Sequence, residues 1–88
     1  DITAIYDEWI ALLRTALSAM RRRGELRSDA DPRQLARFMV TAHQGGALLT
    51  QATRSIKPLR DALDGAVEYI YSFATEPVTL APRKRKRS

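Results

Sequence analysis

His43 is the only histidine in this 88-residue sequence, and the sequence contains no cysteine. An imidazole can bind a metal or carry a proton, but a metal site needs several converging ligands. No second histidine or set of converging carboxylates accompanies His43, which falls on the apolar side of a predicted helix. The sequence therefore favours a satisfied core histidine, and we expect no metal and no cofactor.

Three acidic residues, Asp61, Asp64 and Glu68, recur at helical spacing on a predicted solvent-facing side. Charge on that side of a helix is most simply explained by solubility. The sequence has no Ser/His/Asp set, no glycine-rich phosphate loop and no carboxylate pair at a pocket-like position. It therefore predicts a protein that is not an enzyme.

The net charge of +5 comes from one short run at the end of the chain. Five of the fifteen basic residues lie there, and the other ten balance the ten acidic residues. Such a run attracts phosphates without reading sequence, but here no aromatic residues interleave it and no helix-turn-helix precedes it. We expect residues 77–88 to be a basic, flexible tail, with its charges on Arg83, Lys84, Arg85, Lys86 and Arg87.

Apolar residues recur with helical spacing in three stretches, which predicts an all-α domain of three antiparallel helices over residues 1–76. The expected helices run over about 2–23, 32–54 and 58–74. Gly24 suits the left-handed position that ends a helix. Proline in the Glu76-Pro77 pair stops the third helix.

The second expected helix carries the clearest start signal in the chain. Asp31 can cap it, Pro32 fits its first position, and Gln34 stands where a capping box has Glu or Gln. Lys57 precedes a proline and so disfavours the helical conformation, which places the break before the third helix near residues 55–57.

The width of the apolar arc differs among the three helices. With residues about 100° apart, the arc spans roughly 180° on the first helix, 200° on the third and 240° on the second. Three helices of a short chain cannot easily cover this surface, so we expect another copy or a further segment to cover it.

Gly45 and Gly46 stand in the middle of the second helix, where each glycine costs about 1 kcal/mol relative to alanine. The pair predicts that another helix crosses closely, and a kink is the alternative. Tyr6, Trp9 and Phe38 lie on inward faces, where they form core or line a small-molecule cavity. Both interpretations stay open.

No apolar run approaches the roughly 18 residues of a membrane span, and no signal peptide is visible. We therefore expect a cytoplasmic protein without membrane contact. The chain begins at Asp1 inside an expected helix, which suggests a piece of a longer protein.

Several short segments follow one another in a distinctive order: Trp9, Gly24-Glu25-Leu26-Arg27, Asp29-Ala30-Asp31-Pro32, Leu35-Ala36-Arg37-Phe38, Gln44-Gly45-Gly46-Ala47-Leu48-Leu49 and Pro58-Leu59-Arg60. Together they resemble the C-terminal regulatory domain of TetR-family transcriptional repressors, over about residues 5–74. In that family the DNA-binding helix-turn-helix lies at the N-terminus, and nothing here matches it. The resemblance implies that DNA is contacted only through an absent N-terminal domain.

The resemblance further implies a homodimer in which the last two helices pair with those of a second subunit as a four-helix bundle. The interface expected on this basis comprises Gly45, Leu49, Ala52, Leu63, Ala66, Val67 and Ile70. A charged residue at Gly45 or Leu63 is expected to split the dimer.

An unknown small-molecule effector is also implied, with Trp9, Leu13, Phe38 and His43 as candidate contacts. The resemblance also implies that the helices that usually enclose most of the family's effector pocket precede Asp1. The function predicted is that of the dimerisation and effector-sensing part of a ligand-responsive repressor. The alternative is a stand-alone helical interaction module whose basic tail binds nucleic acid or an acidic partner.

Overall fold

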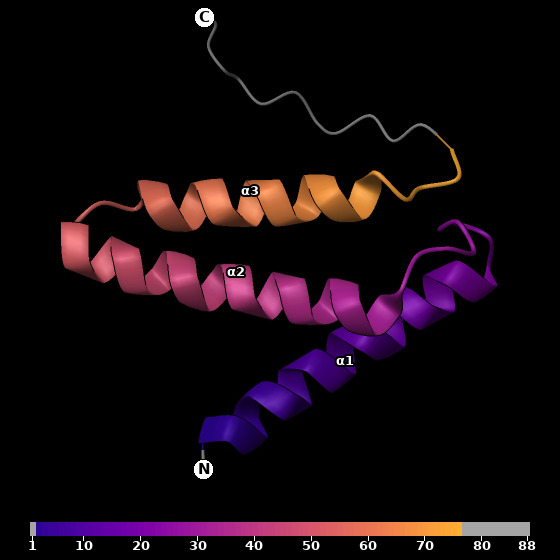
Figure 1. The fold of residues 1–88 in the computed structure, drawn as a ribbon, viewed down its shortest axis with the longest axis horizontal. Helices are drawn as coiled ribbons and strands as arrows, with labels where there is room; N and C mark the ends of the chain where they lie inside the picture. Colours follow the sequence, from indigo (N-terminus) through magenta and orange to yellow (C-terminus); the bar gives the residue numbers. More distant parts are fainter. Residues whose placement is uncertain (1, 77–88) are drawn as a thin grey trace, which may run out of the picture.

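The computed structural model describes residues 2–76 and shows three helices that reverse direction in turn (Figure 1). They are α1 (Ile2–Arg22), α2 (Pro32–Thr53) and α3 (Lys57–Tyr71). This part of the chain contains no strand, only one isolated antiparallel bridge between Leu26 and Ala74. The prediction of an all-α fold is confirmed. The predicted tail with its basic run lies outside the described residues.

The sequence signals at the ends of α1 and α2 act as expected, with one exception. Gly24 has a φ of +81°, so the left-handed end of α1 is confirmed. The Asp31 carboxylate accepts the backbone N–H groups of Arg33 and Gln34 at 3.1 and 3.3 Å, which caps α2. The Gln34 side chain does not complete a capping box, because its amide bonds the hydroxyl of Tyr69 on α3 instead.

The third helix ends three residues earlier than predicted, at Tyr71. Beyond it the chain turns back toward the loop between α1 and α2. The backbone N–H of Arg27 donates to the carbonyl of Phe73 at 2.8 Å, and that of Thr75 donates to the carbonyl of Glu25 at 3.0 Å. The backbone groups of Phe73 and Thr75 therefore form hydrogen bonds with the loop instead of continuing the helix.

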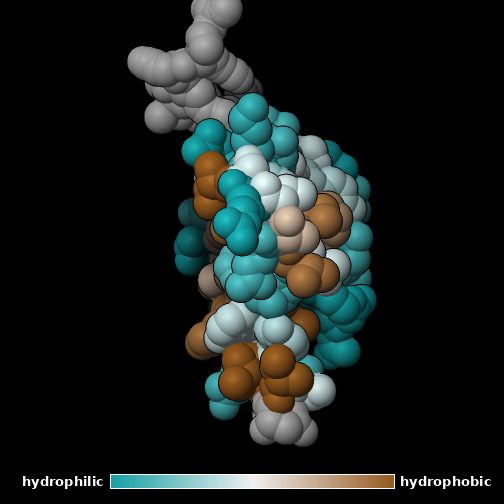
Figure 2. Space-filling view, turned by 90° about the vertical axis from the view of Figure 1, so that its left-hand side faces the viewer, coloured by the Kyte–Doolittle hydropathy of each residue, from teal (hydrophilic) through white to brown (hydrophobic). Residues whose placement is uncertain are grey.

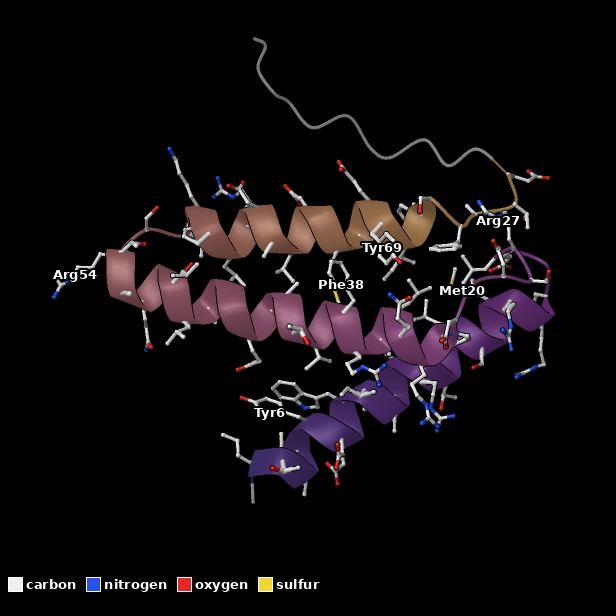
Figure 3. All side chains as sticks on the ribbon, in the orientation of Figure 1. Tyr6, Met20, Arg27, Phe38, Arg54 and Tyr69 are labelled. Carbon is white, nitrogen blue, oxygen red and sulfur yellow. The ribbon has the colours of Figure 1, made fainter. Side chains whose placement is uncertain are left out.

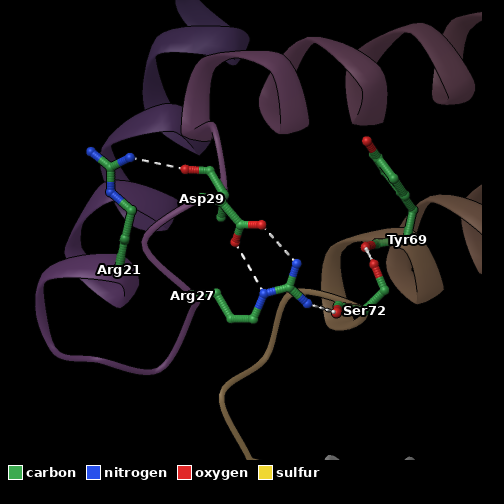
Figure 4. A network of polar contacts seen from close by, with 6 residues as sticks. Arg21, Arg27, Asp29, Tyr69 and Ser72 are labelled. Carbon is green, nitrogen blue, oxygen red and sulfur yellow. Dashed lines mark hydrogen bonds and ion pairs between the residues drawn. The ribbon is translucent and has the colours of Figure 1, made fainter.

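Arg27 reinforces this junction (Figure 4). Its guanidinium donates to both carboxylate oxygens of Asp29, at 3.0 and 2.8 Å, and to the carbonyl of Ser72 at 3.1 Å. It also lies 5.1 Å from the ring centroid of Phe73, a cation–π distance. We call this group of contacts the Arg27 clamp. It joins the loop after α1 to the end of α3.

The three helices form a thin layer with α2 in the middle (Figure 1). Within the described chain α1 and α3 each pack on α2 and have no close backbone contact with each other. The layer measures 43 × 40 × 15 Å, and its radius of gyration is 14.5 Å. A compact domain of this length would have a radius of about 11–12 Å. The molecule therefore has a small core and a large exposed surface for its size.

The core lies where the end of α1, the start of α2 and the end of α3 meet. Its buried side chains are Leu17, Leu26, Ala30, Leu35, Ala36 and Ile70. The far ends of the helices lie outside this core. Figure 2 shows hydrophobic side chains gathered where α1 begins, in agreement with the exposure of Ile2 and Ile5.

The close helix crossing predicted from the glycine pair is present at Gly46. A Cβ on Gly46 would lie 2.8 Å from the Cα of Leu59 on α3, too near for any side chain. A Cβ on Gly45 would meet nothing within 4 Å. Only the second glycine is therefore required by packing within one chain.

Candidate functional site

A groove of about 400 Å³ opens between α1 and α3. We call it the Trp9 groove, and its walls are formed by Trp9, Leu12, Leu13, Met39, Val40, His43 and Leu63. This volume falls within the range of small-molecule sites, which are mostly apolar with a few polar groups. No charged side chain is among its lining residues.

A short hydrogen-bonded chain sets the orientation of the histidine in this groove. The Tyr6 hydroxyl of α1 donates to Oε1 of Gln44 at 2.7 Å, and Nε2 of Gln44 lies 2.8 Å from Nδ1 of His43. The Trp9 ring meets the imidazole edge to face, with centroids 6.1 Å apart. Figure 3 shows Tyr6 between α1 and α2, the two helices that these hydrogen bonds connect.

Three of the four residues predicted to contact an effector, Trp9, Leu13 and His43, lie together in the Trp9 groove. Phe38 does not line it, because its ring packs against Tyr69 of α3 with centroids 5.1 Å apart (Figure 3). Leu12, Met39 and Val40 also line the groove but were not predicted, although Leu12 is three residues after Trp9 and the other two are four and three residues before His43. Helical spacing alone could have indicated all three. Leu63 comes from a separate helix, and no local pattern pointed to the groove.

The other side of α2 is exposed, and an uncharged arc runs along it beside the exposed Arg37. Seven residues lie within an arc of about 100° there, and Tyr69 of α3 continues this surface by bonding Gln34 and packing on Phe38. All eight are exposed. We call this surface the open face, and its members are Gln34, Phe38, Thr41, Gly45, Leu48, Leu49, Ala52 and Tyr69.

The seven residues predicted for a dimer interface lie in different places. Gly45, Leu49 and Ala52 belong to the open face. Leu63 lines the Trp9 groove, and Val67 on the same helix is half-buried. Ala66 and Ile70 are buried within the chain, so the packing of α3 already accounts for their apolar character.

The acidic residues of α3 lie away from both surfaces. Asp61, Asp64 and Glu68 are exposed, as expected from their spacing. Over residues 2–76, no three His, Cys, Asp or Glu side chains are grouped so that they could hold a metal ion. Within the same residues, no helix is long and apolar enough to span a bilayer.

The tetracyclin repressor-like C-terminal domain is the family whose sequence model matches this chain, over residues 1–66. No curated protein matches the chain. No solved structure matches it. The family match covers three quarters of the sequence and includes the groove, the glycine pair and most of α3. The chain belongs to the family of tetracyclin repressor-like C-terminal domains, which makes it a regulatory domain of a TetR-type regulator.

Proposed function

We propose that this chain is the dimerisation and effector-sensing part of a ligand-responsive transcriptional repressor. The observation that carries the proposal is the open face. It is an uncharged, largely apolar surface on the last two helices, and it includes Leu48 and Leu49 with exposed fractions of 67% and 55%. Contiguous apolar surface of this kind marks an interaction site.

A second copy of the same chain fits this surface. Gly45 has no neighbour within 4 Å of its missing side chain, so another helix can approach α2 closely at that point. In a symmetric dimer the same patch on both subunits meets, and a patch without charge avoids self-repulsion. The interface proposed from the structure uses the open face, including Gly45, Leu49 and Ala52. Ala66 and Ile70 support it from beneath by holding α3 on α2.

The Trp9 groove and the open face involve different residues of α2. Two chains could therefore pair through the open face and leave the groove accessible to an effector. Leu63 lines the groove from α3, and Tyr69 of the same helix belongs to the open face. A molecule that pushes on Leu63 would shift α3 and thus the open face. Allosteric coupling requires a structural element whose position is affected by binding at both sites, and α3 would be that element. The DNA readers of the two subunits would then no longer fit successive half-sites.

Sedimentation equilibrium of the full chain tests the dimer. Leu49→Glu places a charge in the open face, and Leu12→Glu is its matched control on α1, where Leu12 has an exposed fraction of 71%. We expect dimers for the unmodified chain and for Leu12→Glu, and monomers for Leu49→Glu, because a buried unpaired charge is costly. A folded Leu49→Glu chain that keeps the dimer mass would exclude the open face as the interface.

A further inference from the structure

We propose that His43 selects the chemical class of the effector: an apolar molecule that carries one uncharged hydrogen-bond acceptor. The inference rests on the proposed effector-sensing function, and it assigns the specificity to one atom, the Nε2 of His43. That atom would donate a hydrogen bond to a ketone, ester or amide oxygen, or to a ring nitrogen, of the bound molecule.

The orientation of the Gln44 amide determines which nitrogen of the His43 imidazole carries the proton. Its Oε1 accepts from the Tyr6 hydroxyl, and its NH₂ group lies at His43. An amide NH₂ can only donate, and therefore Nδ1 of His43 accepts at 2.8 Å. In a neutral imidazole the proton then sits on Nε2, which becomes a donor.

Nε2 has no hydrogen-bond acceptor among the described residues, while Nδ1 is occupied by Gln44. His43 is half-buried and lines the groove, and the edge-to-face contact with Trp9 limits rotation of its ring. A donor with a fixed direction is therefore presented in the Trp9 groove. Such a donor favours a ligand with an acceptor at one position and gives nothing to a hydrocarbon.

The rest of the groove excludes charged ligands. Five of its lining side chains are aliphatic, namely Leu12, Leu13, Met39, Val40 and Leu63, and Trp9 adds an apolar ring. A carboxylate or ammonium group that enters between these walls would lose part of its hydration without gaining a counter-ion. Apolar walls with a single oriented donor thus define the ligand class as uncharged, apolar and acceptor-bearing.

Matched probes test this assignment. We would titrate the full chain with 4-phenylcyclohexanone, phenylcyclohexane and 4-phenylcyclohexanecarboxylate at about pH 8. Fluorescence of Trp9 reports binding directly, because it is the only tryptophan in the sequence and lines the groove. The variant His43→Phe keeps an aromatic ring beside Trp9 and removes the donor.

We expect His43→Phe to weaken binding of the ketone roughly five-fold relative to the hydrocarbon, the effect of one neutral hydrogen bond. The carboxylate is expected to bind at least about ten-fold more weakly than the ketone to the unmodified chain. Gln44→Leu frees both tautomers of the imidazole, so it should lower the ketone preference about two-fold. Gln51→Leu, at an exposed glutamine of the same helix, is the control and should leave the preference unchanged.

Two failures are distinguishable. If neither uncharged probe changes the fluorescence of Trp9, the groove is not a ligand site, and the effector-sensing function fails together with this inference. If the probes bind but the ratio of ketone to hydrocarbon affinity is equal in the unmodified chain and in His43→Phe, only the role of His43 is overturned.

Discussion

The two sides of α2 differ in how much of their surface is covered within the chain, and the neighbouring glycines Gly45 and Gly46 show the difference most clearly. Gly46 lies against α3, where a Cβ would come within 2.8 Å of the Leu59 backbone. Gly45, one residue earlier, faces open space. The covered side also holds Leu35, which is fully buried, whereas the open side exposes two thirds of Leu48.

This contrast shows that similar residue types on one helix serve different purposes. A glycine in a helix interior lowers helix stability by about 1 kcal/mol, so each needs a compensating reason. For Gly46 that reason is the close approach of α3 within the chain. For Gly45 the chain itself offers none, and the proposed partner subunit supplies one. Covered residues thus report on folding, and open residues on the proposed pairing of two chains.

The largest expected effect comes from emptying the covered side. Leu35→Ala removes the largest fully buried side chain and should lower the free energy of unfolding by about 2–5 kcal/mol. Leu48→Ala deletes the same atoms on the open side and should change it by no more than about 0.5 kcal/mol in dilute, monomeric samples. Urea unfolding followed by circular dichroism measures both. Similar losses for the two variants would show that the open side is covered within one chain.

The glycine pair gives the next largest contrast. Gly46→Ala should destabilise the chain by about 1–3 kcal/mol, because the Leu59 backbone cannot move aside cheaply. Gly45→Ala should stabilise the monomer by up to about 1 kcal/mol through better helix propensity. The same added methyl group should weaken dimer formation if α2 of a second copy lies there. Thermal unfolding at low concentration and sedimentation at high concentration separate the two effects, and stabilisation of the dimer by Gly45→Ala would argue against close contact at Gly45.

The smallest effect concerns the Arg27 clamp, which holds the covered side together at one end. The hydrogen bond from Arg27 lowers the pKa of the Asp29 carboxyl below its ordinary value, so the ion pair stabilises the fold above the unfolded-state pKa. That contribution is lost as the pH falls through the lower, folded-state pKa. The melting temperature of Arg27→Ala should therefore fall below that of the unmodified chain at neutral pH, and the gap should narrow below about pH 4.

Arg23→Ala is the control for the clamp. Arg23 pairs with Glu25 and lowers the pKa of that carboxyl in the same way, but its pair does not reach α3. Acid should narrow the melting-temperature deficit of both variants to a similar extent, because each variant lacks one ion pair with a carboxylate. Only Arg27→Ala should keep a deficit in acid, because its contacts with Ser72 and Phe73 do not depend on a carboxylate. Equal deficits at low pH would show that the contact with α3 adds no stability.

The helix boundaries were predictable where a residue acts through its own backbone or its nearest neighbours. Gly24 ended α1 and Asp31 capped α2 as expected, because φ preference and capping depend on local geometry. The left-handed conformation of Arg54 just after α2, with a φ of +58°, has no such signal, since glycine or asparagine usually takes this conformation. The early end of α3 depends on pairing with a loop about 45 residues away, which periodicity cannot reveal.

The candidate site was predictable only in part, for a related reason. Helical spacing placed Trp9, Leu13 and His43 on apolar sides, and these three do share the groove. Helical spacing could not show which neighbouring helix each apolar side would contact. Phe38 turned toward Tyr69 instead, and Leu63 entered the groove from α3. The directions of packing around α2 come from tertiary contacts, which one helix's pattern does not contain.

Disulfide cross-linking tests the proposed pairing of open faces most directly. The sequence has no cysteine, so single cysteines can be placed one at a time at Gly45, Leu48, Leu49, Ala52 and, as a control on α1, Leu12. Two cysteines bridge only when their Cα atoms come within about 7 Å, and residues beside a two-fold axis face their own copies. We predict rapid cross-linking of the 88-residue chain for at least one of the four open-face positions and none for Leu12→Cys. Cross-linking through Leu12→Cys alone would contradict the proposed pairing of open faces.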